Sequence, residues 1–179
     1  MVRRRRVLGW LAALGAPGLA AQAAAQPAGC RLAPASRLSG SGTWMMETLW
    51  AYRVSAEGAY ARPMGFDQPV ELRSGANRVT VDFIHGDVPV RRVPGGLDAV
   101  ESAAMREDLL RGLEALGAAG CPPESFTLFT SRDPGPGLLY RNALIPVTPR
   151  SAVAVRFIDQ PNANIPFRDR EVFLLRARG

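Results

Sequence analysis

The most regular alternation of apolar and polar positions in the chain lies in residues 43–54, with the sequence TWMMETLWAYRV. A period of two places alternate side chains on opposite faces, as a half-buried β-strand requires. One face then carries Trp44, Met46, Thr48, Trp50, Tyr52 and Val54. A large aromatic face of this kind is typical of a hydrophobic core, of a small-molecule pocket or of a partner surface. We therefore predict one long strand or a bent pair of strands, with Trp44, Trp50 and Tyr52 either in the core or at a ligand or partner site.

Shorter apolar runs between turn residues predict further strands. In one of them, Val79, Val81 and Phe83 combine the period of two with β-branched and aromatic residues. Pro89 cannot donate a backbone hydrogen bond, so we expect its strand to lie at the edge of a sheet. The predicted strands cover residues 43–54, 70–73, 78–84, 88–93, 125–131, 138–147, 152–158 and 171–176.

A change to a helical period predicts one long helix over Asp98–Cys121. Its leucines recur at i, i+1, i+4 and i+7 and so share one face. These are Leu109, Leu110, Leu113 and Leu116, while Glu101, Glu107, Asp108, Arg111 and Glu114 fall on other faces. Asp98 and Glu101 have the spacing of a capping box, which predicts the start of the helix. Gly117 and Gly120 each offer a left-handed C-terminal residue and Pro122 prevents continuation, so the helix should end near Cys121.

One charged side chain, that of Arg106, falls on the predicted buried face of this helix. An unpaired charge is costly there, so the guanidinium either reaches the rim or pairs with an acid such as Glu47. In the second case Arg106 becomes a candidate polar group of a ligand cavity.

Together these elements predict an α+β fold. We expect mostly antiparallel β-sheet of about seven to eight strands, with one long helix between two β-rich halves. The 154 residues that follow residue 25 suffice for one domain with its own core, which we place at residues 43–179.

The first 25 residues have the composition of a signal peptide. Four arginines at positions 3–6 precede an apolar run over residues 7–20, which is shorter than the roughly 20 residues that span a bilayer as a helix. Small residues then offer cleavage sites. The segment fits an ordinary Sec signal, and Arg4-Arg5 also fits a twin-arginine signal. We expect a periplasmic or secreted protein with no transmembrane segment in its mature chain.

Export bears on the only two cysteines, Cys30 and Cys121. In an oxidising compartment we expect them to form a disulfide, which would tie the lead-in of residues 26–42 to the end of the helix. The alternative is two buried free thiols.

Export also changes the meaning of the net charge of +6. Removal of the four leading arginines leaves 18 Lys+Arg against 16 Asp+Glu, dispersed along the chain. A nucleic-acid-binding surface needs a clustered basic patch, so we expect no nucleic-acid partner.

Candidate chemistry centres on His85, the only histidine, which lies between Asp82 and Asp87. A carboxylate beside a histidine can orient it for acid–base catalysis. No motif selects a nucleophile, and a strand that ends in His-Gly-Asp also makes a good turn. The chain has too few ligands for a zinc site and no cofactor motif, so we expect neither metal nor cofactor.

Part of the front half resembles exported bacterial chalcone-isomerase-like proteins. The resemblance rests on Leu38-x-Gly40-x-Gly42 through Tyr52 and on Tyr60 to Gly65-Phe66-Asp67-x-Pro69, about 30 residues in all. It implies an α+β fold that binds fatty-acid-like ligands, and it does not extend beyond the predicted helix.

The function expected from these features is that of an exported, non-catalytic binding or assembly module. Its ligand site would hold a small apolar ligand or a protein partner at Trp44, Trp50, Tyr52 and Arg106. Two alternatives are a small secreted enzyme of the hydrolase or isomerase type that uses His85, and a structural subunit of an envelope complex.

Overall fold

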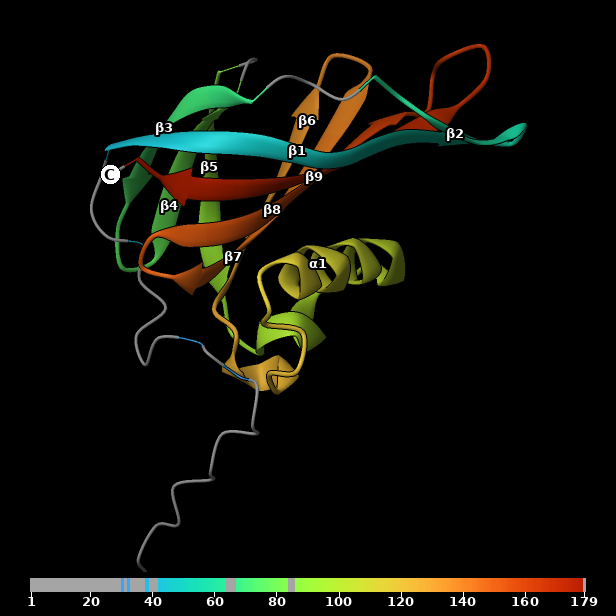
Figure 1. Ribbon diagram of the computed structural model, residues 1–179. Coiled ribbons are helices and arrows are strands. Elements are labelled where there is room, and N and C mark those ends of the chain that lie inside the picture. The colour runs from blue at the N-terminus through green and yellow to red at the C-terminus, as the bar shows by residue number, and fades with distance from the viewer. Residues whose placement is uncertain are drawn as a thin grey trace, which may run out of the picture.

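The computed structural model describes Cys30, Leu32, Leu38 and residues 42–63, 67–83 and 86–178 (Figure 1). The strands are β1 (Gly42–Ser55), β2 (Gly58–Ala61), β3 (Gln68–Ser74), β4 (Arg78–Phe83), β5 (Gly86–Val93), β6 (Leu128–Gly135), β7 (Leu138–Thr148), β8 (Ser151–Gln160) and β9 (Phe167–Ala177). The helices are α1 (Ala103–Ala115) and the short 3-10 helices η1 (Gly96–Ala99) and η2 (Pro123–Ser125).

Eight of these strands form a closed antiparallel β-barrel. They follow the order β1-β3-β4-β5-β6-β7-β8-β9, and β9 pairs back onto β1. The short strand β2 pairs only with the end of β1 and lies outside the closed ring. The predicted α+β fold is therefore wrong, because strands from both sides of the helix pair with each other in one continuous sheet. The period of two identifies strands but carries no information about which distant strands pair.

A β-bulge in β1 changes which side chains share a face. Thr48 lies opposite Phe173 on β9, but Trp50 lies opposite Val172, the next residue back along β9. One extra residue on β1, Leu49, therefore reverses the alternation. As a result the predicted single aromatic face does not exist, and Trp44 faces the barrel interior whereas Trp50 and Tyr52 face outward.

The barrel interior holds one of two hydrophobic clusters. Trp44 is 1% exposed and packs there with side chains from seven other strands. The buried members are Leu38, Trp44, Met46, Val70, Leu72, Val79, Val81, Val90, Phe129, Leu144, Ala152, Ala154, Phe173 and Leu175. They fill the interior as side chains fill other eight-stranded barrels.

The second cluster lies outside the barrel, where α1 covers β7, β8 and β9 (Figure 1). Leu109 and Leu113 of the helix are fully buried against the outward-facing Val153 and Val172. Gly112 lies so close to the sheet that a Cβ atom would come within 2.5 Å of Val153 Cγ1. The helix therefore covers one outer face of the barrel, and most of its contacts are with β8 and β9.

The helix is shorter than predicted. Val100 is extended, and the N-cap is Ser102, whose hydroxyl accepts a hydrogen bond from Met105 N. Asp98, the predicted cap, belongs to η1 instead. The long helix over 98–121 is therefore wrong at its start, because a Ser cap competes with the earlier capping box. It is also wrong at its end, because α1 ends at Ala115 and Gly117, rather than Gly120, takes the left-handed conformation after it. Leu110 is exposed although the leucine pattern placed it on the buried face.

The predicted disulfide is confirmed. Cys30 and Cys121 are joined, with 4.7 Å between their Cα atoms. The bond ties residue 30 to the segment that follows α1, and Cys121 belongs to the cluster under the helix. In the part of the chain that the structure describes, no helix has the length and apolar character needed to cross a membrane.

Candidate functional site

The interior of the barrel changes from apolar to charged toward one end. On β8 the interior positions run from Ala152 and Ala154 to Arg156, and on β9 they run from Phe173 to Glu171 and Asp169. The strand period of two places all of these side chains on the same face. We call this end of the barrel, where the β1–β2 hairpin and the β8–β9 loop lie, the mouth (Figure 1).

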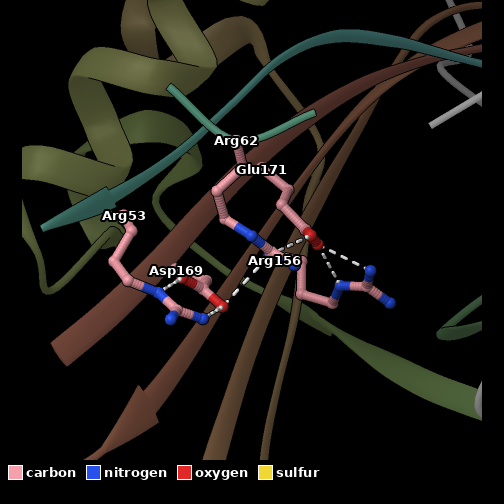
Figure 2. Close-up of polar contacts among 5 residues, drawn as sticks. All are labelled: Arg53, Arg62, Arg156, Asp169 and Glu171. Atoms are coloured by element: carbon pink, nitrogen blue, oxygen red, sulfur yellow. Dashed lines mark hydrogen bonds and ion pairs between the residues drawn. The ribbon is translucent and has the colours of Figure 1, made fainter. Parts of the chain in front are cut away.

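Five charged residues form a connected network at the mouth, which we call the mouth cluster (Figure 2). It consists of Arg53, Arg62, Arg156, Asp169 and Glu171. Arg53 holds Asp169 in a two-pronged contact, with Nε at 2.7 Å from Oδ1 and Nη2 at 2.9 Å from Oδ2. Arg156 donates from Nε and Nη2 to Glu171 Oε2, each at 2.6 Å.

Arg62 joins the two halves of the mouth cluster. Its Nη1 lies 3.0 Å from Asp169 Oδ2 and 3.1 Å from Glu171 Oε1. All four carboxylate oxygens thus accept from guanidinium groups, as buried charges require. The hydrogen bonds to Asp169 raise the pKa of Arg53, so its guanidinium stays charged at any physiological pH.

The mouth cluster carries one excess positive charge, because three guanidinium groups face two carboxylates. The two carboxylates are nearly buried, whereas the side chains of Arg53 and Arg62 are 30% and 34% exposed. The charge that faces solvent is therefore positive. Low-dielectric walls around such a charge concentrate its field and attract anions.

Next to the mouth cluster lies an open recess of about 310 Å³, which we call the mouth recess. Arg53 forms part of its wall, with its guanidinium stacked 3.5 Å above the ring of Phe167. Tyr60 and Ile165 also line it and are 49% and 45% exposed, which is unusual for large apolar side chains in this protein. Ser55, Glu57, Ala163 and Asn164 complete the lining.

Sheet register explains why these groups meet. Arg53 lies directly opposite Tyr60 on β2 and opposite Asp169 on β9. Arg62 follows β2 by one residue and donates its backbone N–H to Ala51 O, the residue opposite Glu171. Neighbouring residues in one lateral row of a sheet point the same way, so the row brings cation, carboxylate and aromatic ring together.

A second polar row continues inside the barrel from Arg156. Asn142 lies opposite Arg156 on β7, is 3% exposed, and donates to Ser131 Oγ at 3.1 Å. Asn142 Oδ1 is buried and has no hydrogen-bond partner among the described residues. The row forms a polar floor between the mouth and the apolar interior cluster.

On the outer face, a separate polar group connects the helix to the sheet. The fully buried Asp108 accepts from Arg170 Nε at 2.8 Å and Nη2 at 2.7 Å, and from Tyr52 Oη at 3.1 Å. Burial, with the Asp108 charge next, raises the pKa of Tyr52 to about 12. Burial lowers the pKa of Arg170, but its hydrogen bonds to Asp108 outweigh this and leave the pKa raised. These contacts fasten α1 to β9.

The predicted ligand residues do not come together. Trp44 is buried in the interior cluster, and Trp50 packs on the outer cluster with its Nε1 buried and without a partner among the described residues. Tyr52 binds Asp108, as described above. The side chain of Arg106 reaches the rim of the buried helix face, which is one of the two predicted outcomes. There its Nη2 lies 2.7 Å from Asp98 Oδ1. Glu47, its alternative partner, pairs with Arg176.

Of the predicted catalytic candidates, Asp82 lies on β4 and Asp87 on β5. His85 lies outside the described residues. Asp82 and Asp87 are exposed cross-strand partners, and Asp87 forms an ion pair with Arg73. Among the residues that the structure describes, no group of three or more His, Cys, Asp or Glu side chains is placed to hold a metal ion.

Sequence reasoning missed the mouth cluster. In β9 the run Arg168-Asp169-Arg170-Glu171 is charged at every position, so no apolar alternation marks a buried face. The only available signal was the absence of that alternation beside an apolar run, Val172–Leu175. A strand that is apolar over one half and charged over the other fits a barrel whose interior becomes polar at one end.

The fold and the site define a class: a closed antiparallel β-barrel with a covering helix and an arginine-rich ion network in its mouth. Comparison of the chain with protein-family models, with curated proteins and with solved structures gives no match. The functional conclusion therefore rests on the geometry of the site.

Proposed function

We propose that the protein is an exported, non-catalytic binding module that holds an organic anion in the mouth of its barrel. The anionic group binds between Arg53 and Arg62, and a flat apolar body lies in the mouth recess against Tyr60, Ile165 and Phe167. The observation that carries this proposal is the excess positive charge of the mouth cluster, which adjoins a recess of about 310 Å³ whose wall includes Arg53 and the exposed Glu57.

Several features support this proposal over a purely structural role. A buried ion network contributes little net stability compared with apolar packing, so stability alone is a weak reason for it. Arg62 makes both of its ion pairs with Nη1, so that Nε and Nη2 take no part in either pair. A recess of this size lies at the lower end of the range for small-molecule sites. Arginine forms paired hydrogen bonds with carboxylates, which favours a carboxylic acid as ligand.

The compartment is part of the same proposal. The features of residues 1–25 favour export, and a disulfide persists in an oxidising compartment such as the periplasm. The contacts at the mouth use guanidinium groups, which stay protonated at physiological pH, and this favours binding over acid–base catalysis.

Titration calorimetry with naphthoate, an aromatic carboxylate with two rings, tests the proposal. We expect saturable binding by the intact protein and weaker binding of the neutral naphthamide. Arg62→Met should weaken naphthoate binding about ten-fold or more, because a charge-assisted hydrogen bond is worth roughly 1.5–3 kcal/mol. Arg62→Lys should recover part of the loss, since it restores the charge without the fork of donors.

The matched control is Arg73→Met, which removes the same charge from an exposed pair remote from the mouth. It should leave naphthoate binding unchanged. Equal binding by the intact protein and the Arg62→Met variant, with both folded, would overturn the proposal.

A further inference from the structure

A second cavity, of about 190 Å³, lies on the opposite face of the sheet, between the start of α1 and strands β6 and β7. We call it the side cleft. Its apolar wall is made by Val93, Ala99, Val100 and Met105. Its polar wall is made by Glu101, Ser102, Thr130, Ser131, Arg132, Arg141 and Asn142. The side cleft is separated from the mouth cluster by the thickness of the sheet, because Arg132 and Arg141 occupy the outward-facing positions next to the inward-facing Ser131 and Asn142.

Two arginines on neighbouring strands line the side cleft. Arg132 and Arg141 are direct cross-strand partners of β6 and β7, so their Cβ atoms are about 4.5–5.5 Å apart. Like charges in this position destabilise a sheet unless an anion lies between or beside them. Arg132 is exposed and makes no ion pair within the described part of the chain.

The nearby carboxylates do not neutralise this pair of arginines. Arg141 Nη2 binds Asp159 Oδ2 at 2.7 Å, but Asp159 is shared with Arg168. Glu101 also lines the cleft and is exposed to solvent. Three guanidinium groups therefore face two carboxylates, and the balance is positive.

Arg141 also has an unused donor. Its Nε is buried and has no hydrogen-bond partner among the described residues. Leaving a buried donor without an acceptor is costly. An acceptor with negative charge is the group that would satisfy it best.

We propose that the side cleft is a second binding site, specific for a small carboxylic acid with an apolar body of about one ring. The carboxylate binds Arg141 and Arg132, and the body lies against Val93, Val100 and Met105. The size follows from the volume, since a cavity of about 150 Å³ is known to hold benzene. The side cleft is smaller than the mouth recess, which suits it to one ring rather than two. The two sites are independent, and this one does not rest on the proposed function of the mouth.

Methyl NMR of Met105 gives a readout that belongs to this cleft. The chain contains five methionines, and Met105 lines the side cleft whereas none of the methionines that the structure describes lines the mouth recess. Titration of the full protein with benzoate should shift the Met105 methyl signal saturably, with a dissociation constant of about one millimolar for a ligand this small. Benzamide, which has the same shape without the charge, should bind at least ten-fold more weakly, because the charge-assisted bonds are lost.

Variants then locate the site. Arg141→Met should weaken the benzoate response about ten-fold or more. Should that variant fail to fold because Asp159 loses a partner, Arg132→Met, at an exposed position, should still weaken the response about two- to five-fold. Val93→Phe fills the apolar end and should abolish the response without touching either arginine.

The matched control is Arg62→Met at the mouth, which should leave the Met105 response to benzoate unchanged. Absence of a Met105 shift up to about ten millimolar benzoate, ten times the expected constant, would overturn the proposal. So would an equal response to benzamide, or an unchanged response in folded Val93→Phe protein. None of these outcomes bears on naphthoate binding at the mouth, so the two proposals fail separately.

Discussion

At the scale of single residues, Asp108 holds the helix to the barrel. Its carboxylate is fully buried and binds Arg170 and Tyr52, and Arg170 also donates to the Ala104 carbonyl at 3.0 Å. The leucine pattern placed this acid on a polar face of the helix. The pattern distinguishes apolar from polar positions. It cannot show that Asp108 is buried, because that burial depends on Arg170, a cation on a distant strand.

Replacement of Asp108 by alanine should therefore destabilise the protein strongly. Arg170 would keep its charge in a nearly buried position without its carboxylate, and loss of one partner of a buried pair costs about 3–5 kcal/mol. The matched control is Glu107→Ala on the same helix, which breaks only an exposed pair with Arg111 and should cost about 0.5 kcal/mol or less. Urea unfolding of both variants measures the difference, and equal free energies of unfolding would contradict the role of Asp108.

Tyr52 predicts how stability changes in alkaline solution. Its pKa is raised from 10.0 to about 12 in the folded protein. Below pH 10 both folded and unfolded states keep the phenol proton, so Tyr52 does not make stability depend on pH there. Between pH 10 and 12 the unfolded state loses the proton first and binds fewer protons, so the free energy of unfolding falls as pH rises.

The check is urea unfolding across this pH window for the intact protein and for Tyr52→Phe. The variant cannot ionise at this position, so its free energy of unfolding should fall less steeply. Parallel pH profiles, or a Tyr52 phenolate that appears at the pH of an exposed tyrosine, would contradict the burial of this hydroxyl beside Asp108.

The residues of the mouth cluster were not predictable from the sequence for a related reason. Arg53 and Asp169 are far apart in the chain and meet only because β1 pairs with β9. In the sequence, each of these two residues is one charged residue among many, and such residues usually lie on a solvent-exposed face. The aromatic row was visible in sequence, but the bulge at Leu49 divided it between two faces, and nothing in the local pattern marks the bulge.

At the scale of elements, the segment between β5 and β6 shows what local signals can define. The sequence correctly indicated a helix with Leu109 and Leu113 inside, because the helical period is local. It placed the start five residues too early, at Asp98 rather than at Ala103. The chain first forms η1, and η1 packs against η2 through Gly96, a contact between residues more than 25 positions apart.

Gly96 is required at this contact for two reasons. Its φ is +57°, and an added Cβ would lie 2.2 Å from the carbonyl oxygen of Pro123. We expect Gly96→Ala to cost about 4 kcal/mol or more, because a backbone clash adds to the roughly 1–2 kcal/mol of left-handed strain. Differential scanning calorimetry of the variant would show a lower Tm.

Gly117 provides the matched control for Gly96. Its φ is +69°, but apart from its chain neighbours no described residue has an atom within 4 Å of an added Cβ. Gly117→Ala should therefore show the strain alone, about 1–2 kcal/mol. An equal loss of stability in Gly96→Ala and Gly117→Ala would mean that the contact between η1 and η2 does not constrain the chain.

At the scale of the whole molecule, closure of the barrel is the property that sequence reasoning could not reach. Most strands were indicated by their period of two, and most strands that are neighbours along the chain pair directly, although β3 pairs with β1 rather than with β2. Closure depends on the pairing of β1 with β9 and on the pairing of β5 with β6, two strands that the helix separates in the sequence. These pairings depend on twist, stagger and side-chain volume summed over eight strands, which no short stretch of sequence encodes. The disulfide was predictable because only one pairing of two cysteines exists.

The disulfide should act mainly on the unfolded chain. It closes a loop with a sequence separation of 91 residues, and in the chain-entropy model such a loop contributes about 4–5 kcal/mol. Reduction should therefore lower the free energy of unfolding by up to about that amount. It should also increase the dependence of this free energy on urea, because a chain without the cross-link exposes more surface when it unfolds.

Two comparisons separate loss of the cross-link from damage at Cys121, which is buried in the cluster under α1. The double variant Cys30→Ser and Cys121→Ser should resemble the reduced protein in its dependence on urea and should not respond to reductant. Suppose instead that Cys121 mattered only through packing. Reduction would then leave the unfolding curve unchanged, because the buried sulfur atoms stay in place. Only the double variant, which replaces the Cys121 side chain, would lose stability. An unchanged curve on reduction would thus assign the stabilisation to the buried side chain rather than to the covalent link between residue 30 and the end of the helix.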